Sequence, residues 1–306
     1  MRMKNKLIHV LLKNSPEWSL EMAKRIKKSF RNQKLVQQQK NGGFTKEDLI
    51  SDFKKIGIAE GDVLLVHSSL SKIGFVHGGP NAVIQALIET IGPAGTLLMP
   101  SFPAKGRNKD YLNANPLFDV LNTPSAMGII TEEFRKMKGV KRSLHPTDPI
   151  CAFGLLAEYL TATHLGRKTP YDQESPFRKL AEKKGKILML GTTLNGAGTS
   201  LHTLEDAVDF KYPVYDDQLF DVQLKDEVGH IHNVQTKVHN PIYSAKRNCD
   251  ALVPIFEKEN VLTKGKVAEA NTLLLNAEKM LAVMLKYYHD YGVTMYTPYG
   301  DKNQLA

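Results

Sequence analysis

The chain has 306 residues, of which 42% are hydrophobic, so it can bury one large core or two modest ones. Its two cysteines, Cys151 and Cys249, stand in no CxxC or Cys/His spacing, which excludes a readable disulfide framework or zinc site. No apolar run approaches the roughly 20 residues that a membrane span requires, and the chain starts without a long apolar signal stretch. We therefore expect a cytoplasmic protein, or at most a membrane-peripheral one.

The net charge of +9 comes from one end of the chain. Residues 1–46 hold 12 Lys/Arg against two acids, and the rest is nearly neutral. We expect residues 1–43 to form a basic helical N-terminal extension, followed by a main domain over 44–306. Such a segment can lie on an anionic membrane, but packing on the body or on a second subunit is the preferred interpretation. It carries no nucleic-acid-binding motif, so we expect no nucleic-acid partner.

Strand and helix patterns alternate through most of the main domain, which predicts an α/β fold. Thr45 can cap the first helix of the domain, and Gly92 ends another whose first turn suits Pro80. Helices are expected over 45–58, 80–92, 125–139, 201–210 and 266–291. Strands are expected over 62–70, 95–102, 183–191, 220–225 and 230–238.

The loop after the first strand is a candidate ligand site, because loops that follow buried strands usually bind the ligands of α/β proteins. The strand ends with imidazole and hydroxyl side chains. A glycine pair then begins a helix, and the N-terminus of that helix favours an anion such as phosphate. Hydroxyls here can equally satisfy the backbone of a turn. The residues concerned are His67, Ser68, Ser69, Gly78 and Gly79.

A second candidate loop, residues 141–149, lies between a predicted helix and a run that leads into a strand. Arg142, Ser143 and His145 offer a cation, a hydroxyl and an imidazole to phosphate or amide groups. Pro146 stiffens the loop. A surface loop with an exposed basic pair is an equally good interpretation of the same residues.

The third candidate is "GTSLHTLEDA", residues 198–207, in which His202 stands three residues before Glu205. Histidine is the usual general base near neutral pH, and a carboxylate that accepts its other ring N–H fixes the tautomer. Helical spacing of three allows that contact. Inert surface helices carry such pairs too, so this loop favours catalysis only together with the other two.

Several catalytic signatures are absent from the sequence, including a GxSxG elbow, a GxxxxGKS phosphate loop and an HExxH zinc motif. The loop before the second helix is also no GxGxxG fingerprint. No sequence motif therefore supports a hydrolase, kinase or metalloprotease function.

Taken together and in order, four blocks resemble the aminoglycoside 3-N-acetyltransferase family. They contain the motifs LLVHSSL, KRSLHP, KILMLG and TSLHTLED, and they span residues 61–102, 118–146, 174–191 and 199–206. A weaker match follows over 265–285. The resemblance implies that family's fold, a mixed central sheet flanked by helices, for the acetyltransferase domain over 44–306.

The resemblance also implies acetyl-CoA as co-substrate, without a metal. It places the coenzyme A site in the loop after the first strand, the glycine-started helix and the RSLHP segment. The family's catalytic histidine falls on His202 and its acidic partner on Glu205. An amine that is protonated in water cannot attack a thioester, so His202 suits the removal of that proton.

The mechanism expected from the resemblance is direct transfer in a ternary complex. His202, oriented by Glu205, deprotonates the acceptor amine, which attacks the acetyl carbonyl, and backbone N–H groups or the hydroxyl of Ser200 stabilise the oxyanion. The acidic run 203–227 can face a cationic acceptor, starting from Asp206 and Asp209. A solvated acidic face is the alternative.

The acceptor itself is left open. Drug-acetylating members read RSxHPxHS in the basic loop, where this chain has Asp148 and Pro149, so membership does not imply drug resistance. An aminoglycoside and another amino sugar both fit, and the basic extension favours a nucleotide-linked or lipid-linked amino sugar of surface-polysaccharide synthesis. A binding protein that kept the fold without the chemistry is the alternative from another class.

Overall fold

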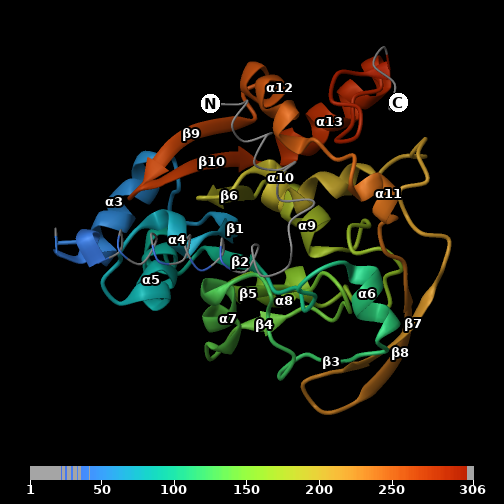
Figure 1. Cartoon of the computed structure of the whole chain (residues 1–306), viewed down its shortest axis with the longest axis horizontal. Coiled ribbons are helices and arrows are strands. Elements are labelled where there is room, and N and C mark those ends of the chain that lie inside the picture. Colours follow the sequence, from blue (N-terminus) through green and yellow to red (C-terminus); the bar gives the residue numbers. More distant parts are fainter. Residues whose placement is uncertain are drawn as a thin grey trace.

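The computed structural model describes residues 36–40 and 42–301, together with the single positions Met22, Arg25, Ser29 and Gln33. One seven-stranded sheet and one three-stranded sheet are present in this part of the chain, and helices lie on both faces of the larger sheet (Figure 1). The predicted α/β class and mixed central sheet are confirmed. Most of the predicted basic extension lies outside the described residues.

The described elements follow the predicted alternation over most of the domain. The helices of seven or more residues are α3 (Lys46–Lys55), α5 (Gly79–Ile91), α7 (Ile129–Lys136), α9 (Pro176–Glu182) and α13 (Ala277–Tyr291). Shorter helices are α4 (Leu70–Ile73), α6 (Asn108–Asn113), α8 (Ala157–Thr161), α10 (Leu194–Ala197), α11 (Pro241–Ser244) and α12 (Val253–Lys258), with 3₁₀ turns η1 (Thr199–Leu204) and η2 (Cys249–Leu252). The strands are β1 (Val63–Ser68), β2 (Thr96–Pro100), β3 (Leu117–Asp119), β4 (Lys141–Arg142), β5 (Ile150–Gly154), β6 (Lys186–Leu190), β7 (Phe220–Lys225), β8 (Ile231–Thr236), β9 (Leu262–Val267) and β10 (Ala270–Asn276).

Three parallel strands form the centre of the large sheet. Strand β1 lies between β2 and β6 and is parallel to both, while β5 and β10 pair with them antiparallel on either side, giving the order β4-β5-β2-β1-β6-β10-β9. Alternate residues of β1 belong to different cores: Leu64 packs with α3, α5 and α7, whereas Leu65 packs with α8, α9 and α13. Because both faces are covered, β1 reads as a continuous apolar run.

The predicted helix over 266–291 is wrong in its first part. Residues 262–276 form the hairpin β9–β10, and the helix starts only at Ala277. Strand β10 pairs with the central strand β6, opposing Leu275 to Ile187, and this pairing outweighs the local helix preference of the Leu run. The side chain of Asn276 caps α13 by accepting from the backbone N–H of Lys279, so the strand ends where the helix begins.

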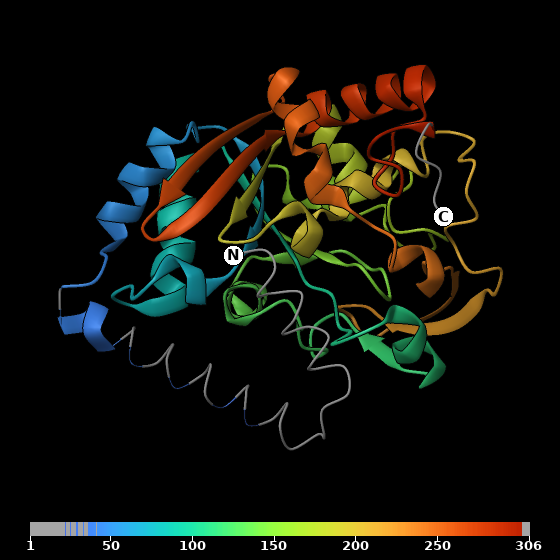
Figure 2. The ribbon, with the colours of Figure 1, turned by 45° about the horizontal axis from the view of Figure 1, so that its top comes forward.

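Local sequence rules succeed at helix starts. Thr45 caps α3 as predicted, and the capping box is completed by Asp48. The predicted helix over 201–210 is reduced to the 3₁₀ turn η1. Figure 2 shows α13 beyond the end of β10, away from α3 and α5. None of the helices in the described residues is long and apolar enough to cross a membrane.

Candidate active site

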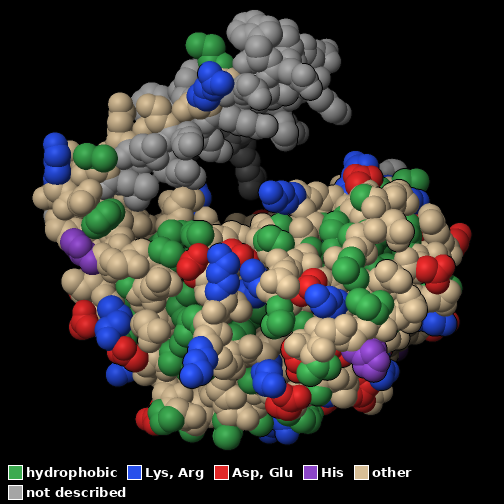
Figure 3. Space-filling view, turned by 90° about the horizontal axis from the view of Figure 1, so that it is seen from below, with side chains coloured by type: hydrophobic (Ala, Val, Ile, Leu, Met, Phe, Trp, Pro, Cys, Tyr) green, Lys and Arg blue, Asp and Glu red, His purple; other side chains and the backbone are tan. Residues whose placement is uncertain are grey.

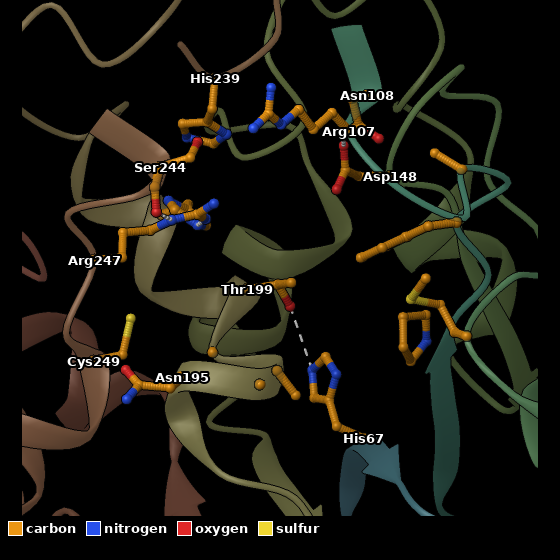
Figure 4. Close-up of a pocket in the computed structure, with 18 of the residues that line it drawn as sticks. His67, Arg107, Asn108, Asp148, Asn195, Thr199, His239, Ser244, Arg247 and Cys249 are labelled. Atoms are coloured by element: carbon orange, nitrogen blue, oxygen red, sulfur yellow. Dashed lines mark hydrogen bonds between the residues drawn. The ribbon is translucent and has the colours of Figure 1, made fainter. Parts of the chain in front are cut away.

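A cavity of about 650 Å³ opens at the carboxyl ends of the three parallel strands. Residues at the end of β1, in the loop after β2 and in the segment 192–202 after β6 contribute to its wall, and the segment 239–249 closes the other side (Figure 4). This is where ligands bind in open α/β sheets. The polar lining residues are His67, Ser68, Arg107, Asn108, Lys109, Thr131, Asp148, Tyr171, Thr192, Asn195, Thr199, His202, His239, Ser244 and Arg247.

His202 and Glu205 meet as the sequence predicts. Both lie at the turn η1, where the spacing of three residues brings Nδ1 of His202 to 2.8 Å from Oε1 of Glu205. Since the carboxylate accepts, Nδ1 carries the hydrogen and Nε2 is left as the acceptor nitrogen. Nε2 lies 2.8 Å from Nη1 of Arg247, another cavity residue. The ring is thus fixed in the tautomer that a general base needs.

The Glu205 carboxylate has two further partners, neither of them local. Nε2 of His239 donates to Oε2 at 2.7 Å, and the hydroxyl of Tyr296 donates to Oε1 at 2.7 Å. The Glu205 side chain is completely buried. Burial alone raises its pKa, but the two histidines lower the pKa more and hold it well below its usual value. Glu205 is therefore a fixed anion beneath His202.

The pKa of His202 is lowered to about 4, chiefly because burial disfavours the charged ring. Glu205 opposes this effect, while His239 and Arg247 add to it. His202 is therefore neutral near pH 7 and can accept a proton at Nε2. The buried carboxylate then stabilises the imidazolium that forms.

The first candidate loop divides between the cavity and the surface. His67 and Ser68 line the cavity, and Nε2 of His67 lies 3.4 Å from the hydroxyl of Thr199. Burial lowers the pKa of His67 to about 4. Ser69, Gly78 and Gly79 do not line this cavity; the glycines begin α5.

In the second candidate loop Arg142, Ser143 and His145 are buried and do not line the cavity, whereas Lys141 is exposed and Asp148 lines the cavity. The Arg142 guanidinium is buried and donates to the carbonyls of Ser101, Val120 and Thr123. Ser143 bonds to Nδ1 of His164, and His145 stacks on the same ring at 4.6 Å between centroids. None of these three predicted residues lines the cavity. Their buried contacts instead hold β4 and β5 in place.

Three residues predicted for substrate contact lie outside the cavity lining. Ser200 is buried, and its hydroxyl has no hydrogen-bond partner in the described structure. Asp206 accepts from the hydroxyl of Tyr215 at 3.2 Å, and burial raises its pKa to about 6. Asp209 is exposed. Of the acidic run, Asp216 is paired with Lys109, so the run forms no wall of this cavity.

Asp148 is the one carboxylate among the cavity-lining residues. Its Oδ1 accepts from the hydroxyl of Tyr171 at 3.0 Å, and its Oδ2 from Nδ2 of Asn108 at 3.2 Å. Burial raises its pKa. Three cations, Arg107, Lys109 and Arg247, share the lining; Lys109 is paired with Asp216 outside it, so Arg107 and Arg247 outnumber the one carboxylate and the cavity is weakly basic. On the face in Figure 3, by contrast, Lys and Arg are interspersed with Asp and Glu.

Two groups of described side chains bring three potential metal-ligating atoms within 4.8 Å of one another: His202, Glu205 and His239, and Asp226, His230 and His232. In the first group the ring nitrogens that face the carboxylate are already used as hydrogen-bond donors to Glu205. The geometry of this group therefore fits a hydrogen-bonded imidazole and carboxylate pair.

Comparison with known proteins identifies relatives of this chain. The family model described as aminoglycoside 3-N-acetyltransferase matches residues 65–289. The aminoglycoside N(3')-acetyltransferase-like protein YokD of Bacillus subtilis is 33% identical over 183 residues, which cover 55% of this chain and 66% of YokD. Aminoglycoside N(3)-acetyltransferase III of Salmonella is 33% identical over 178 residues, 54% of this chain and 61% of that protein. The matches span less than two thirds of these relatives' length.

Solved structures agree with this placement. The structure of AAC-IIIb in a binary complex with CoASH has a TM-score of 0.67 and 27% identity, and the alignment covers 80% of this chain and 96% of that chain. A sheet and helices with the same arrangement therefore hold coenzyme A in that protein.

Proposed function

The chain belongs to the aminoglycoside 3-N-acetyltransferase family, and we propose that it transfers an acetyl group from acetyl-CoA to an amine of an amino sugar. The observation that carries the proposal is the contact between His202 and Glu205 at the wall of a basic cavity. The structure of AAC-IIIb with CoASH supports coenzyme A as the carrier.

His202 acts as the general base in the proposed reaction. Its Nε2 removes a proton from the acceptor ammonium or amine, the amine nitrogen bonds to the acetyl carbon, and the bond from that carbon to sulfur breaks. The proton on His202 then passes to the departing thiolate, which balances the reaction of a neutral amine; an acceptor that arrives as an ammonium ion releases one further proton to water. Direct transfer of this kind needs both substrates in the cavity at once.

The remaining residues position the base and the co-substrate. Glu205 fixes the ring of His202 and balances its transient positive charge. Arg107 and Lys109, at the cavity wall, offer cations to the phosphates of coenzyme A. His67 and Thr199 line the same space and offer hydrogen bonds to the amides of the pantetheine arm.

A second acceptor class is favoured by the charge of the cavity. Aminoglycosides are polycations and require acidic surroundings, whereas this cavity has one carboxylate and three cations. A nucleotide-linked or other phosphorylated amino sugar fits these charges better. We therefore place such an amino sugar ahead of an aminoglycoside as the acceptor.

Release of free thiol from acetyl-CoA tests the proposal. The purified protein is given kanamycin, gentamicin and a panel of nucleotide-linked amino sugars, and each product is identified by its added acetyl mass. We expect acceptor-dependent thiol release with at least one amine and none with the His202→Ala protein. A wild-type protein that binds acetyl-CoA but acetylates no member of the panel would refute the proposal and favour a non-catalytic binding protein.

A further inference from the structure

We propose that the acceptor carries an anionic group, a phosphate or a carboxylate, and that Arg247 binds this group beside the catalytic base. This inference rests on the proposed function and names the chemical class of its acceptor. Arg247 also has a second effect. In the absence of acceptor it contacts His202 and occupies the nitrogen that acts as the base.

Arg247 reaches the reacting end of the cavity. Its Nη1 lies 2.8 Å from Nε2 of His202, and its Nε donates to the carbonyl of Ser244 at 3.2 Å. Figure 4 shows Arg247 next to Ser244 at the cavity wall, across the space from His67. The side chain is half-buried and follows the short helix α11.

Within the described residues, Arg247 forms no ion pair with a carboxylate. Glu205 is already bonded to His202, His239 and Tyr296, and Asp148, the carboxylate of the cavity lining, is bonded to Tyr171 and Asn108. The two neutral partners of Arg247, the Ser244 carbonyl and the His202 ring, leave the charge of its half-buried guanidinium without a counter-ion in contact. A phosphate or carboxylate would supply the missing charge and accept two parallel N–H bonds from its fork.

The phosphates of coenzyme A cannot be the anion that Arg247 binds during transfer. The acetyl carbonyl must lie beside His202 for the amine to attack, and the phosphates are then a whole pantetheine arm away. Arg247 contacts His202 itself. Its anionic partner therefore belongs to the molecule that brings the amine.

The contact with His202 ties acceptor binding to activation of the base. While Nη1 donates to Nε2, the lone pair that should take the amine proton is occupied. An anion that draws the guanidinium toward itself frees that lone pair at the moment the amine arrives. A polycationic acceptor would do the opposite, since it is repelled by Arg247 and leaves the contact intact.

Arg107 extends toward His239 in Figure 4 and adds a second cation to the cavity lining. A doubly charged phosphate can be balanced by both side chains. A carboxylate needs Arg247 alone. The two sources of negative charge are therefore separable by experiment.

Matched acceptors test the proposal directly. The test compares kcat/KM for four acceptors. Glucosamine carries no anionic group, glucosamine 6-phosphate carries a phosphate, muramic acid carries a carboxylate, and kanamycin is a polycation. We expect kcat/KM for one of the two anionic sugars to exceed that for glucosamine by about 100-fold, the factor that corresponds to the free energy of hydrogen bonds to charged groups. Arg247→Met should remove this preference, so that the ratio of kcat/KM between the anionic sugar and glucosamine falls to about one, whatever the change in the glucosamine rate itself as Nε2 of His202 loses its donor. Lys246→Met, which removes the neighbouring exposed cation, should change neither.

Binding gives a readout that does not depend on turnover. Calorimetry with coenzyme A already bound compares glucose 6-phosphate, glucuronate and glucose with the wild-type and Arg247→Met proteins. We expect an anionic sugar to bind the wild-type protein and to lose most of its affinity in the variant, which still binds coenzyme A. Acetylation of glucosamine or kanamycin as efficiently as both anionic sugars would overturn the anionic acceptor while upholding acetyl transfer. Absence of any acetyl transfer would instead overturn the proposed function, and anion binding that is equal in both proteins would overturn the role of Arg247.

Discussion

His239 and Glu205 are joined by a hydrogen bond of 2.7 Å between Nε2 and Oε2. The carboxylate that orients His202 thus also holds a second histidine of the cavity wall, and the two rings lie 4.3 Å apart between centroids. Their ring nitrogens are used differently. His202 keeps Nε2 as an acceptor facing Arg247, whereas Nε2 of His239 points at Glu205.

This difference predicts which histidine is the base. His202→Ala should lower kcat by about 10²- to 10⁴-fold, the usual contribution of a general base. His239→Ala should lower kcat by about tenfold or less, because it removes a partner of Glu205 and leaves the base. Steady-state kinetics with the best acceptor measure both, and coenzyme A binding by calorimetry controls for folding. Equal losses of kcat in the two variants would contradict His202 as the single base and assign that role to both histidines.

The charge of Glu205 is predicted to matter as much as its shape. Glu205→Gln keeps the size, but a single amide oxygen cannot accept from both His202 and His239. One ring must change tautomer or lose its bond, and the imidazolium of His202 loses its counter-charge. We expect kcat to fall by about 100-fold or more, with coenzyme A binding unchanged.

Glu259→Gln is the matched control, because Glu259 accepts from Tyr287 near the surface and lies outside the cavity lining. Its kinetics should equal those of the wild-type protein. If Glu205→Gln retained more than half of the wild-type kcat, the orienting role of Glu205 would be wrong.

The His202 and Glu205 pair could be predicted because the contact is local, spanning three residues of one turn. The other members of the site come from segments 34, 45 and 91 residues away along the chain: His239 and Tyr296 reach Glu205, and Arg247 reaches His202. Nothing in their own neighbourhoods marks them. Only the folded arrangement of the C-terminal third brings them to η1.

The fold shows the same division between local and distant causes. The capping threonine and the apolar run of β1 were sufficient to predict α3 and β1, since each is decided within a few residues. Strand β10 could not be predicted, because its state is set by pairing with β6. Arg142 was predicted to contact the cofactor or to be exposed, and its burial could not be predicted because its three carbonyl partners lie 19 to 41 residues away in the sequence.

Tyr296 is predicted to support the site through one hydrogen bond. Tyr296→Phe removes the donor to Oε1 of Glu205 and leaves the buried carboxylate with its two histidines. We expect the free energy of unfolding to fall by about 1.5–3 kcal/mol, the value of hydrogen bonds to charged groups. The kcat should fall by about tenfold or less, because Nδ1 of His202 is still held.

Tyr287→Phe is the corresponding control, since it deletes a Tyr–Glu bond of the same 2.7 Å length outside the cavity lining. It should cost less stability, because water can replace the lost donor, and leave kcat unchanged. Urea unfolding and steady-state kinetics measure both effects. An equal loss of stability in the two variants would contradict the importance of the buried carboxylate.

Acid is predicted to destabilise the protein through its buried histidines. Burial lowers the pKa of His67 and His202 to about 4 and that of His145 to about 3, and it lowers the pKa of His164 as well. Unfolding returns each pKa to about 6.5, so the unfolded chain binds more protons between pH 6.5 and about 4. Within that window the free energy of unfolding should fall as the pH falls.

Asp206 acts in the opposite sense, because its raised pKa of about 6 makes the folded state bind a proton first as the pH falls. Burial also raises the pKa of Asp148 and Asp172, which act in the same sense as Asp206. We expect the four histidines, each of which can contribute up to about 3 kcal/mol, to outweigh these carboxyl groups. Denaturant unfolding at pH 7, 6, 5 and 4 measures the slope, and proton uptake on unfolding at pH 5 measures its cause. A free energy of unfolding that stays constant from pH 7 to pH 4 would show that these rings are not held neutral by burial.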